Sequence, residues 1–109
     1  MDENLELSLL YDIYGSLLTS KQKDIFEEYY LYNLSLREIA ENKKISYQAV
    51  RDSINSSKES LRNYESNIGM LQFRSKLEKF KKNVEKKDQI PSSVKCELIN
   101  EINKISEVG

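Results

Sequence analysis

The sequence predicts an all-α fold, and its composition and its apolar spacing both support that prediction. Charged residues make up 32% of the 109-residue chain, which contains one proline and three glycines. This composition suits solvent-facing helices better than a sheet or a disordered tail. Apolar residues recur at intervals of three and four, which gives a helix one apolar face. A chain of this length is expected to form one domain, or a small domain with an arm.

The same composition argues against several function classes. The first residues, MDENLELSLLYDIYG, lack a basic leader and a long apolar run, so we expect a cytoplasmic protein with neither a secretory signal nor a membrane span. Cys96 is the single cysteine and histidine is absent, so we expect no internal disulfide and no metal site. No glycine-rich phosphate loop or activated nucleophile is evident, and we expect no cofactor, no catalytic residue and no enzymatic activity.

Two helices are predicted before residue 31. The second should begin at Thr19, because Thr19 and Gln22 have the capping-box spacing. Tyrosines at helical spacing beside isoleucine and phenylalanine are expected to pack in the core rather than to stack on bases. The first helix, ending near Leu18, is expected to bury a stripe at every fourth residue, Leu5, Leu9, Ile13 and Leu17, with Leu10 and Tyr14 beside it. The inner face of the second is expected to hold Ile25, Phe26, Tyr29 and Tyr30.

A helix-turn-helix is predicted next. Ser35 and Glu38 repeat the capping-box pattern ahead of a short third helix that ends near Asn42. Ser46 is the expected N-cap of a fourth helix, which leaves only a short turn between the two. Helices joined so closely must cross steeply, and we expect the small Ala40 to allow the approach and Ile45 to fill the corner. The buried face of the fourth helix should hold Ala49, Val50, Ile54, Ser57 and Leu61.

These segments resemble a known family. The run LLYDIYGSLLTSKQKDIFEEYY, followed by LSLREIA and ISYQAVRDSI, is similar to the YlxM family of small bacterial proteins over about Leu10 to Glu65. The resemblance implies an all-helical, dimeric protein whose N-terminal part is similar to region four of sigma factors. It also implies a DNA-binding-type surface and a link to the signal recognition particle pathway, since the genes of this family neighbour those of the particle's GTPases.

The predicted fourth helix departs from the family pattern. Family members usually show SRQAVYD, whereas this chain has SYQAVRD, with Tyr47 and Arg51 in exchanged positions. Where the family continues with IKRT, this chain has INSS, and Lys44 stands where such motifs commonly have a small turn residue. The Asp52 carboxylate would also be repelled by the negatively charged phosphates of a duplex. The candidate nucleic-acid-binding residues are Lys43, Lys44, Tyr47, Gln48, Arg51, Asn55 and Lys58.

The C-terminal part is predicted to be a helical arm. A long helix should run from Tyr47 toward Lys87, with a kink at Gly69 because glycine destabilises a helix interior by roughly 1 kcal/mol. Pro91 should precede a final helix, which is expected to pack on the long helix within the chain or across a dimer. We expect a helix-turn-helix domain over 1–65 and an arm over 66–109. The predicted apolar stripe of the final helix is Val94, Leu98, Ile102 and Ile105.

A basic segment in the arm suggests a second interaction surface. Gln72 to Lys87 contains seven lysines or arginines and two glutamates, a local charge of +5. Such a run is either a solvated helix face or a surface for RNA or an acidic protein. The candidate partner-binding residues are Arg74, Lys76, Lys79, Lys81 and Lys82.

Two functions remain open at this point. The altered fourth helix favours an accessory or regulatory protein of the signal recognition particle pathway, which touches the particle's GTPase or its RNA. The alternative is a sequence-specific DNA-binding transcriptional regulator that acts as a homodimer on a two-fold site.

Overall fold

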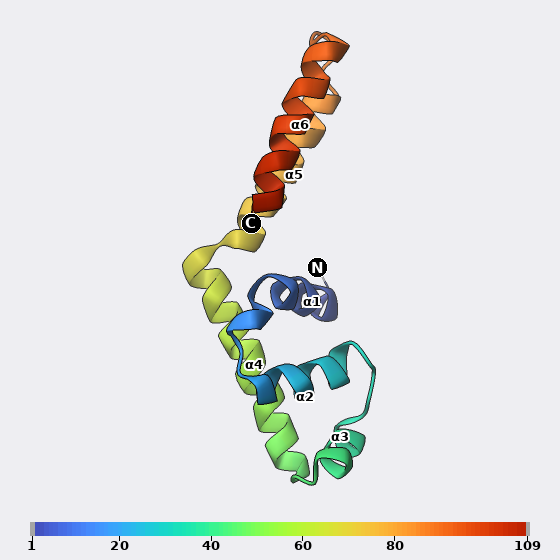
Figure 1. The fold of residues 1–109 in the computed structure, drawn as a ribbon, viewed down its shortest axis with the longest axis vertical. Coiled ribbons are helices and arrows are strands. Elements are labelled where there is room, and N and C mark those ends of the chain that lie inside the picture. Colours follow the sequence, from blue (N-terminus) through green and yellow to red (C-terminus); the bar gives the residue numbers. More distant parts are fainter. Residues whose placement is uncertain (1, 109) are drawn as a thin grey trace. The chain divides into compact units, whose positions relative to one another are not determined.

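The computed structural model describes residues 2–108, with side chains for 2–106, and confirms the all-α prediction. Over these residues the chain forms six α-helices and one short 3-10 helix, and no strand (Figure 1). The elements are α1 (Glu3–Tyr14), η1 (Gly15–Leu17), α2 (Ser20–Tyr30), α3 (Leu36–Lys43), α4 (Tyr47–Ile68), α5 (Met70–Glu85) and α6 (Ser92–Val108).

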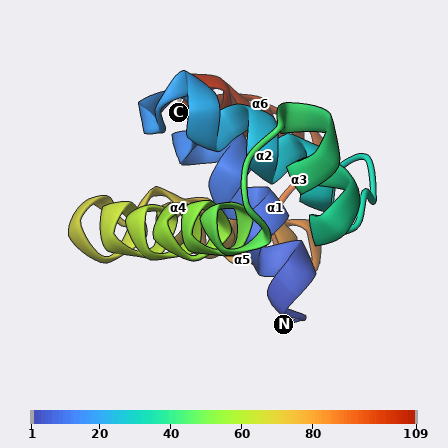
Figure 2. The same cartoon turned by 90° about the horizontal axis from the view of Figure 1, so that it is seen from below.

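The chain divides into two compact units, residues 1–68 and 69–109. In the first unit, α1, α2 and α3 each pack against the long helix α4. Figure 1 shows these three helices meeting α4 at successive points along its length, and Figure 2 shows the same helices from below. In the second unit, α5 and α6 pack side by side as a hairpin (Figure 1). No helix within residues 2–108 is both long and apolar enough to cross a membrane.

The core of the first unit is built on one face of α4. Val50, Ile54, Ser57 and Leu61 are spaced four, three and four residues apart and are all buried, as predicted from the sequence. Ala49, placed on the same face by the prediction, is only half-buried. Ser57 is fully buried, and its hydroxyl has no hydrogen-bond partner among the described residues.

The stripe predicted for the first helix is wrong in part. Leu5 and Leu17 are both 53% exposed, and the buried residues of α1 are Leu7, Leu10 and Tyr14. The helix also ends at Tyr14, four residues before the expected end, and Gly15–Leu17 continue as a 3-10 turn. The sequence of α1 contains two rows of leucines at helical spacing, one with Leu5 and one with Leu7. Packing against the rest of the unit buries the row that contains Leu7.

Aromatic rings join α1, α2 and α4. Tyr11 stacks on the buried Phe26 with 4.6 Å between ring centroids, and Phe26 lies 4.6 Å from Tyr30. Burial, together with a hydrogen bond to Glu27, raises the pKa of Tyr11 to about 12. The Tyr14 hydroxyl donates a 2.7 Å hydrogen bond to Glu65. These contacts confirm that most of the tyrosines of α1 and α2 pack rather than form an open platform for bases.

Gly69 separates two helices instead of kinking one. It adopts the left-handed conformation (φ 73°, ψ 26°), which ends α4 at Ile68 and lets α5 begin at Met70. The continuous helix predicted from Tyr47 toward Lys87 is therefore replaced by α4 and α5, since only glycine adopts this conformation without strain.

The final helix packs on α5 with a different face from the one predicted. Ile102 is buried and Ile99 is half-buried, whereas Val94, Leu98 and Ile105 are 41%, 38% and 48% exposed. A hairpin of two helices buries one face of each helix. Of the two apolar rows of α6, only the row with Ile99 and Ile102 therefore meets α5. The other row remains on the surface.

We predict that Gly15→Ala destabilises the first unit by about 1–3 kcal/mol. A Cβ atom at residue 15 would lie 2.9 Å from the Tyr11 ring, which is held against Phe26 and cannot move freely. The measurement is the free energy of unfolding by urea. When Tyr11 is already changed to Ala, Gly15→Ala should lower the free energy of unfolding far less. An equal decrease with and without the Tyr11 ring would contradict the steric explanation.

Candidate nucleic-acid interface

The helix-turn-helix is fixed at its start by a capping box. The Ser35 hydroxyl accepts a 3.0 Å hydrogen bond from the Glu38 amide, and the Glu38 carboxylate accepts one of 3.1 Å from the Ser35 amide. The N-cap of α4 is Ser46, whose hydroxyl accepts a 3.0 Å bond from the Ala49 amide. Both caps confirm the sequence prediction, and they set where α3 and α4 begin.

The turn between the two helices depends on Lys44. This residue is left-handed (φ 57°, ψ 44°), and the next amide, that of Ile45, donates 3.1 Å to the Ala40 carbonyl. This six-residue closure is the Schellman arrangement, in which glycine is the usual left-handed residue. Ala40 is buried and Ile45 packs against the same core cluster, in agreement with the predicted crossing.

We predict that Lys44→Gly stabilises the protein by about 1 kcal/mol, because a side chain strains the left-handed conformation. Thermal unfolding would show a higher midpoint for this variant. Lys44→Ala is the matched control, since it removes the same charge and keeps the strain, and it should not stabilise. A midpoint that rises equally in both variants would attribute the effect to charge instead.

The outer face of α4 carries the candidate base-contacting residues. Tyr47 is the first residue of the helix and is 47% exposed. Arg51 and Asn55 are exposed, one and two turns further along. The Gln48 amide donates a 2.8 Å hydrogen bond to Asp52, so it would have to leave that carboxylate to contact a base. Four predicted residues therefore share one exposed face.

Two of the predicted phosphate contacts are already engaged inside the first unit. Lys43 lies 3.6 Å from Glu28, and Lys58 lies 3.2 Å from Glu3. Lys58 also lies 6.0 Å from the centre of the Tyr30 ring. Burial lowers the pKa of Lys58, but hydrogen bonds to Tyr30 and Glu3 outweigh burial and raise it above its usual value. Lys58 is therefore held charged beside α1.

Arg62 extends the basic row of α4 and was missed in the sequence. Its guanidinium lies 3.5 Å from Glu6 and 4.0 Å from Glu3. Arg51, Asn55, Lys58 and Arg62 are spaced four, three and four residues apart, and therefore follow one side of the helix. That spacing was available in the sequence, but the acidic partners on α1 were not, since Glu6 lies 56 residues before Arg62.

A hollow of about 190 Å³ opens beside this row. It lies between α2, α3 and α4, and Ile54 and Leu36 supply its apolar lining. Tyr29 and Leu36 had no part in the interface predicted from sequence, because only the packing of α2 and α3 on α4 brings them there. The polar lining residues are Tyr29, Arg51, Asn55 and Lys58.

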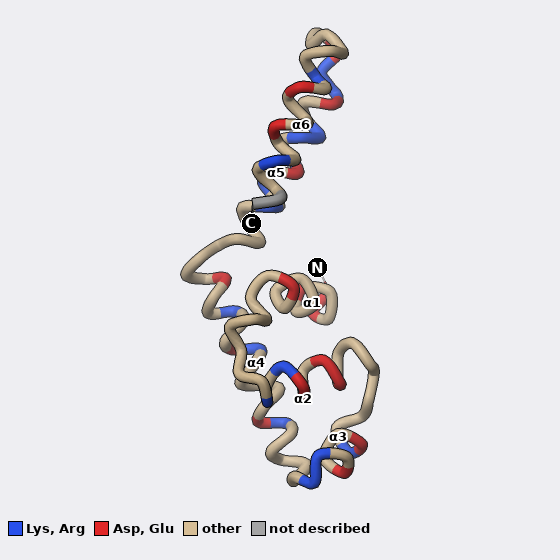
Figure 3. The backbone as a smooth tube through the Cα atoms, viewed as in Figure 1, with Lys and Arg blue, Asp and Glu red and all other residues tan. Residues whose placement is uncertain are grey.

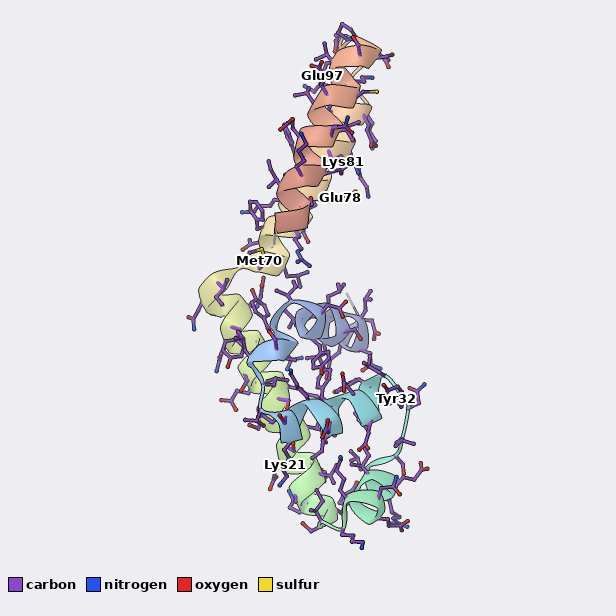
Figure 4. The ribbon with its side chains drawn as sticks, in the orientation of Figure 1. Lys21, Tyr32, Met70, Glu78, Lys81 and Glu97 are labelled. Carbon is purple, nitrogen blue, oxygen red and sulfur yellow. The ribbon has the colours of Figure 1, made fainter. Side chains whose placement is uncertain are left out.

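The second unit carries the predicted partner-binding residues along α5. Lys76, Lys79 and Lys82 are exposed at every third position, and Arg74 and Lys81 are half-buried. The four lysines form no ion pair within the described residues. Figure 3 shows the basic positions recurring along α5, and Figure 4 labels Lys81 and the neighbouring Glu78 on this helix.

Comparisons of the sequence with known proteins place this chain in a family. Residues 1–104 match the family model UPF0122, described as "Putative helix-turn-helix protein, YlxM / p13 like". A UPF0122 protein of Thermoanaerobacter sp. (strain X514) is 39% identical over 114 aligned positions, covering 96% of this chain and 97% of the relative. A UPF0122 protein of Clostridium kluyveri (strain NBRC 12016) is 38% identical over 94% of this chain and 93% of its own length.

Proposed function

Because the chain belongs to the UPF0122 family of YlxM- and p13-like helix-turn-helix proteins, we propose that it is an accessory or regulatory protein of the signal recognition particle pathway. The helix-turn-helix is of the DNA-binding type. In this proposal α5 supplies the main docking surface, for the particle's RNA or its GTPase. The link to the pathway rests on the resemblance to the YlxM family.

The distribution of charge carries this proposal. Residues 1–68 contain eight basic and twelve acidic side chains, a net charge of −4, whereas residues 69–109 contain nine and six, a net charge of +3. A polyanion such as RNA is attracted to the second unit and repelled by the net charge of the first. The candidate surface on α5 therefore lies in the unit with the favourable field.

The state of the cations supports the same conclusion. In the turn and in α4, Lys44 and Arg51 are the cations without an ion pair among the described residues, because Lys58 and Arg62 are paired with α1. A protein that binds a duplex strongly makes about six to ten phosphate contacts. The exposed lysines of α5 have no ion-pair partner to displace among the described residues, which lowers the free-energy cost of binding there.

We predict that changing Lys76, Lys79 and Lys82 together to glutamine weakens binding of signal recognition particle RNA or of its GTPase. For RNA, the slope of log affinity against log salt should fall by about 2 to 3, because three phosphate contacts are lost. Fluorescence anisotropy across roughly 50 to 200 mM salt measures that slope.

The matched control changes Lys21, Lys23 and Arg37 to glutamine, which alters the net charge equally on the first unit. This control should keep the wild-type slope. Unchanged binding by the α5 variant, or an equal loss in the control, would refute α5 as the docking surface.

A second candidate function is a sequence-specific DNA-binding regulator that acts as a homodimer. The exposed face of α4, with Tyr47, Arg51 and Asn55, favours it. A dimer would double the available phosphate contacts and could place two α4 helices in successive major grooves. The exposed row of α6, Val94, Leu98 and Ile105, provides apolar area for such a contact.

We predict that under this second function the Gln48→Ala, Arg51→Ala, Asn55→Ala triple variant loses duplex binding by more than about tenfold, since a bidentate base contact is worth about 1–3 kcal/mol. Anisotropy with a labelled duplex measures the loss, and sedimentation at micromolar concentration measures the dimer. The α5 glutamine variant should bind the duplex as the wild type does. Unchanged duplex binding by the triple variant, or a monomer throughout, would refute this function.

A further inference from the structure

We propose that the hollow between α2, α3 and α4 is a binding site for a single phosphate group, and that Glu3 competes with this phosphate for Lys58. The inference rests on the second candidate function, in which the helix-turn-helix unit binds nucleic acid. It assigns Arg51, Asn55 and Lys58 to the backbone of that nucleic acid and not to its bases.

The lining of the hollow has the chemistry that a phosphate requires. Among the lining residues, Arg51 carries a planar fork of N–H donors, Asn55 an amide and Tyr29 a hydroxyl. Lys58 also lines the hollow and carries an ammonium, which lies 3.2 Å from Glu3. None of the lining residues is acidic. Charge-assisted hydrogen bonds from arginine and lysine to phosphate are about twice as strong as neutral ones, so this set favours an anion over a neutral ligand.

The volume of the hollow and its apolar floor also fit a small anion. A water molecule has a share of about 30 Å³ in the liquid, so a volume of about 190 Å³ holds a tetrahedral phosphate with some of its hydration water. Ile54 is buried and Leu36 is half-buried, and together they exclude water from one side. A lower local dielectric strengthens the interaction of the phosphate with both cations.

Glu3 is placed to compete for one of these cations. Its carboxylate lies 3.2 Å from the Lys58 ammonium and 4.0 Å from Arg62, and its side chain is 57% exposed. Exposed ion pairs contribute little net stabilisation, because water and salt screen them. A phosphate that also gains Arg51 and Asn55 can therefore displace this carboxylate, and α1 reduces the affinity of the hollow without blocking it.

The assignment changes which residues remain for base contacts. Arg51 and Asn55 follow the side of α4 that faces the hollow, together with Lys58. Tyr47 and Gln48 lie outside the lining and at the exposed start of the helix. With the backbone held by the hollow, sequence preference would depend on Tyr47 and Gln48, and Gln48 would first have to leave Asp52.

The test is a titration of the full chain with inorganic phosphate at constant ionic strength, followed by ¹⁵N–¹H NMR. We expect shifts concentrated at Leu36, at the Arg51 guanidinium and at the Asn55 amide. Arg51→Gln should weaken the apparent affinity by about tenfold. Glu3→Gln should tighten it by about two- to fivefold. Asp12→Asn is the matched control, because it removes one exposed charge from the same helix without an ion pair to Lys58.

The outcomes separate this inference from the proposed function. Shifts spread over the lysines of α5, or equal tightening by Glu3→Gln and Asp12→Asn, would overturn the phosphate site. A second arm titrates a mixed-sequence DNA duplex and a single-stranded RNA. If the nucleic acid that binds loses affinity in Arg51→Gln and is also displaced by inorganic phosphate at constant ionic strength, its backbone is the source of the phosphate. If phosphate binds in the hollow and neither nucleic acid binds, the ligand of the site is free phosphate, and the DNA-binding function is refuted.

Discussion

The first unit depends on one buried face of α4. Val50, Ile54, Ser57 and Leu61 follow each other at helical spacing, and α1, α2 and α3 all pack against that helix. No other element in residues 2–68 contacts all three of these helices so extensively. Burial of such side chains contributes roughly 1.5–3 kcal/mol for each large apolar residue, so this face supplies the common surface on which the helix-turn-helix is assembled.

This arrangement has an electrostatic consequence. Packing α1 on α4 brings Glu3 and Glu6 beside Lys58 and Arg62, at the far end of the row that begins with Arg51. The contact that completes the core therefore also neutralises part of the basic surface of the helix-turn-helix. The result is a DNA-binding-type fold with few unpaired cations on α4. In the second unit, the lysines of α5 have no acidic partner among the described residues.

Much of the fold and part of the candidate interface could be predicted from the sequence. The Thr19–Gln22 and Ser35–Glu38 capping boxes are present as expected, and the buried face of α4 and the membership of the YlxM-like family are confirmed. The stripe of α1 was wrong at Leu5 and Leu17. Three of the four residues predicted for the stripe of α6 stay exposed within the chain, and their contact across a dimer stays a prediction. Both helices have two apolar rows, and spacing alone does not tell which row meets a neighbour.

The sequence by itself determined where α2, α3 and α4 begin and where the turn between α3 and α4 lies, because caps and turns are satisfied within a few residues along the chain. Only the tertiary structure decided which cations stay available, since the pairing of Lys58 with Glu3 joins residues 55 positions apart. The hollow beside Arg51 has the same origin: Tyr29, Leu36 and Asn55 belong to three different helices. Interactions between distant segments depend on packing geometry, which no local pattern of residues specifies.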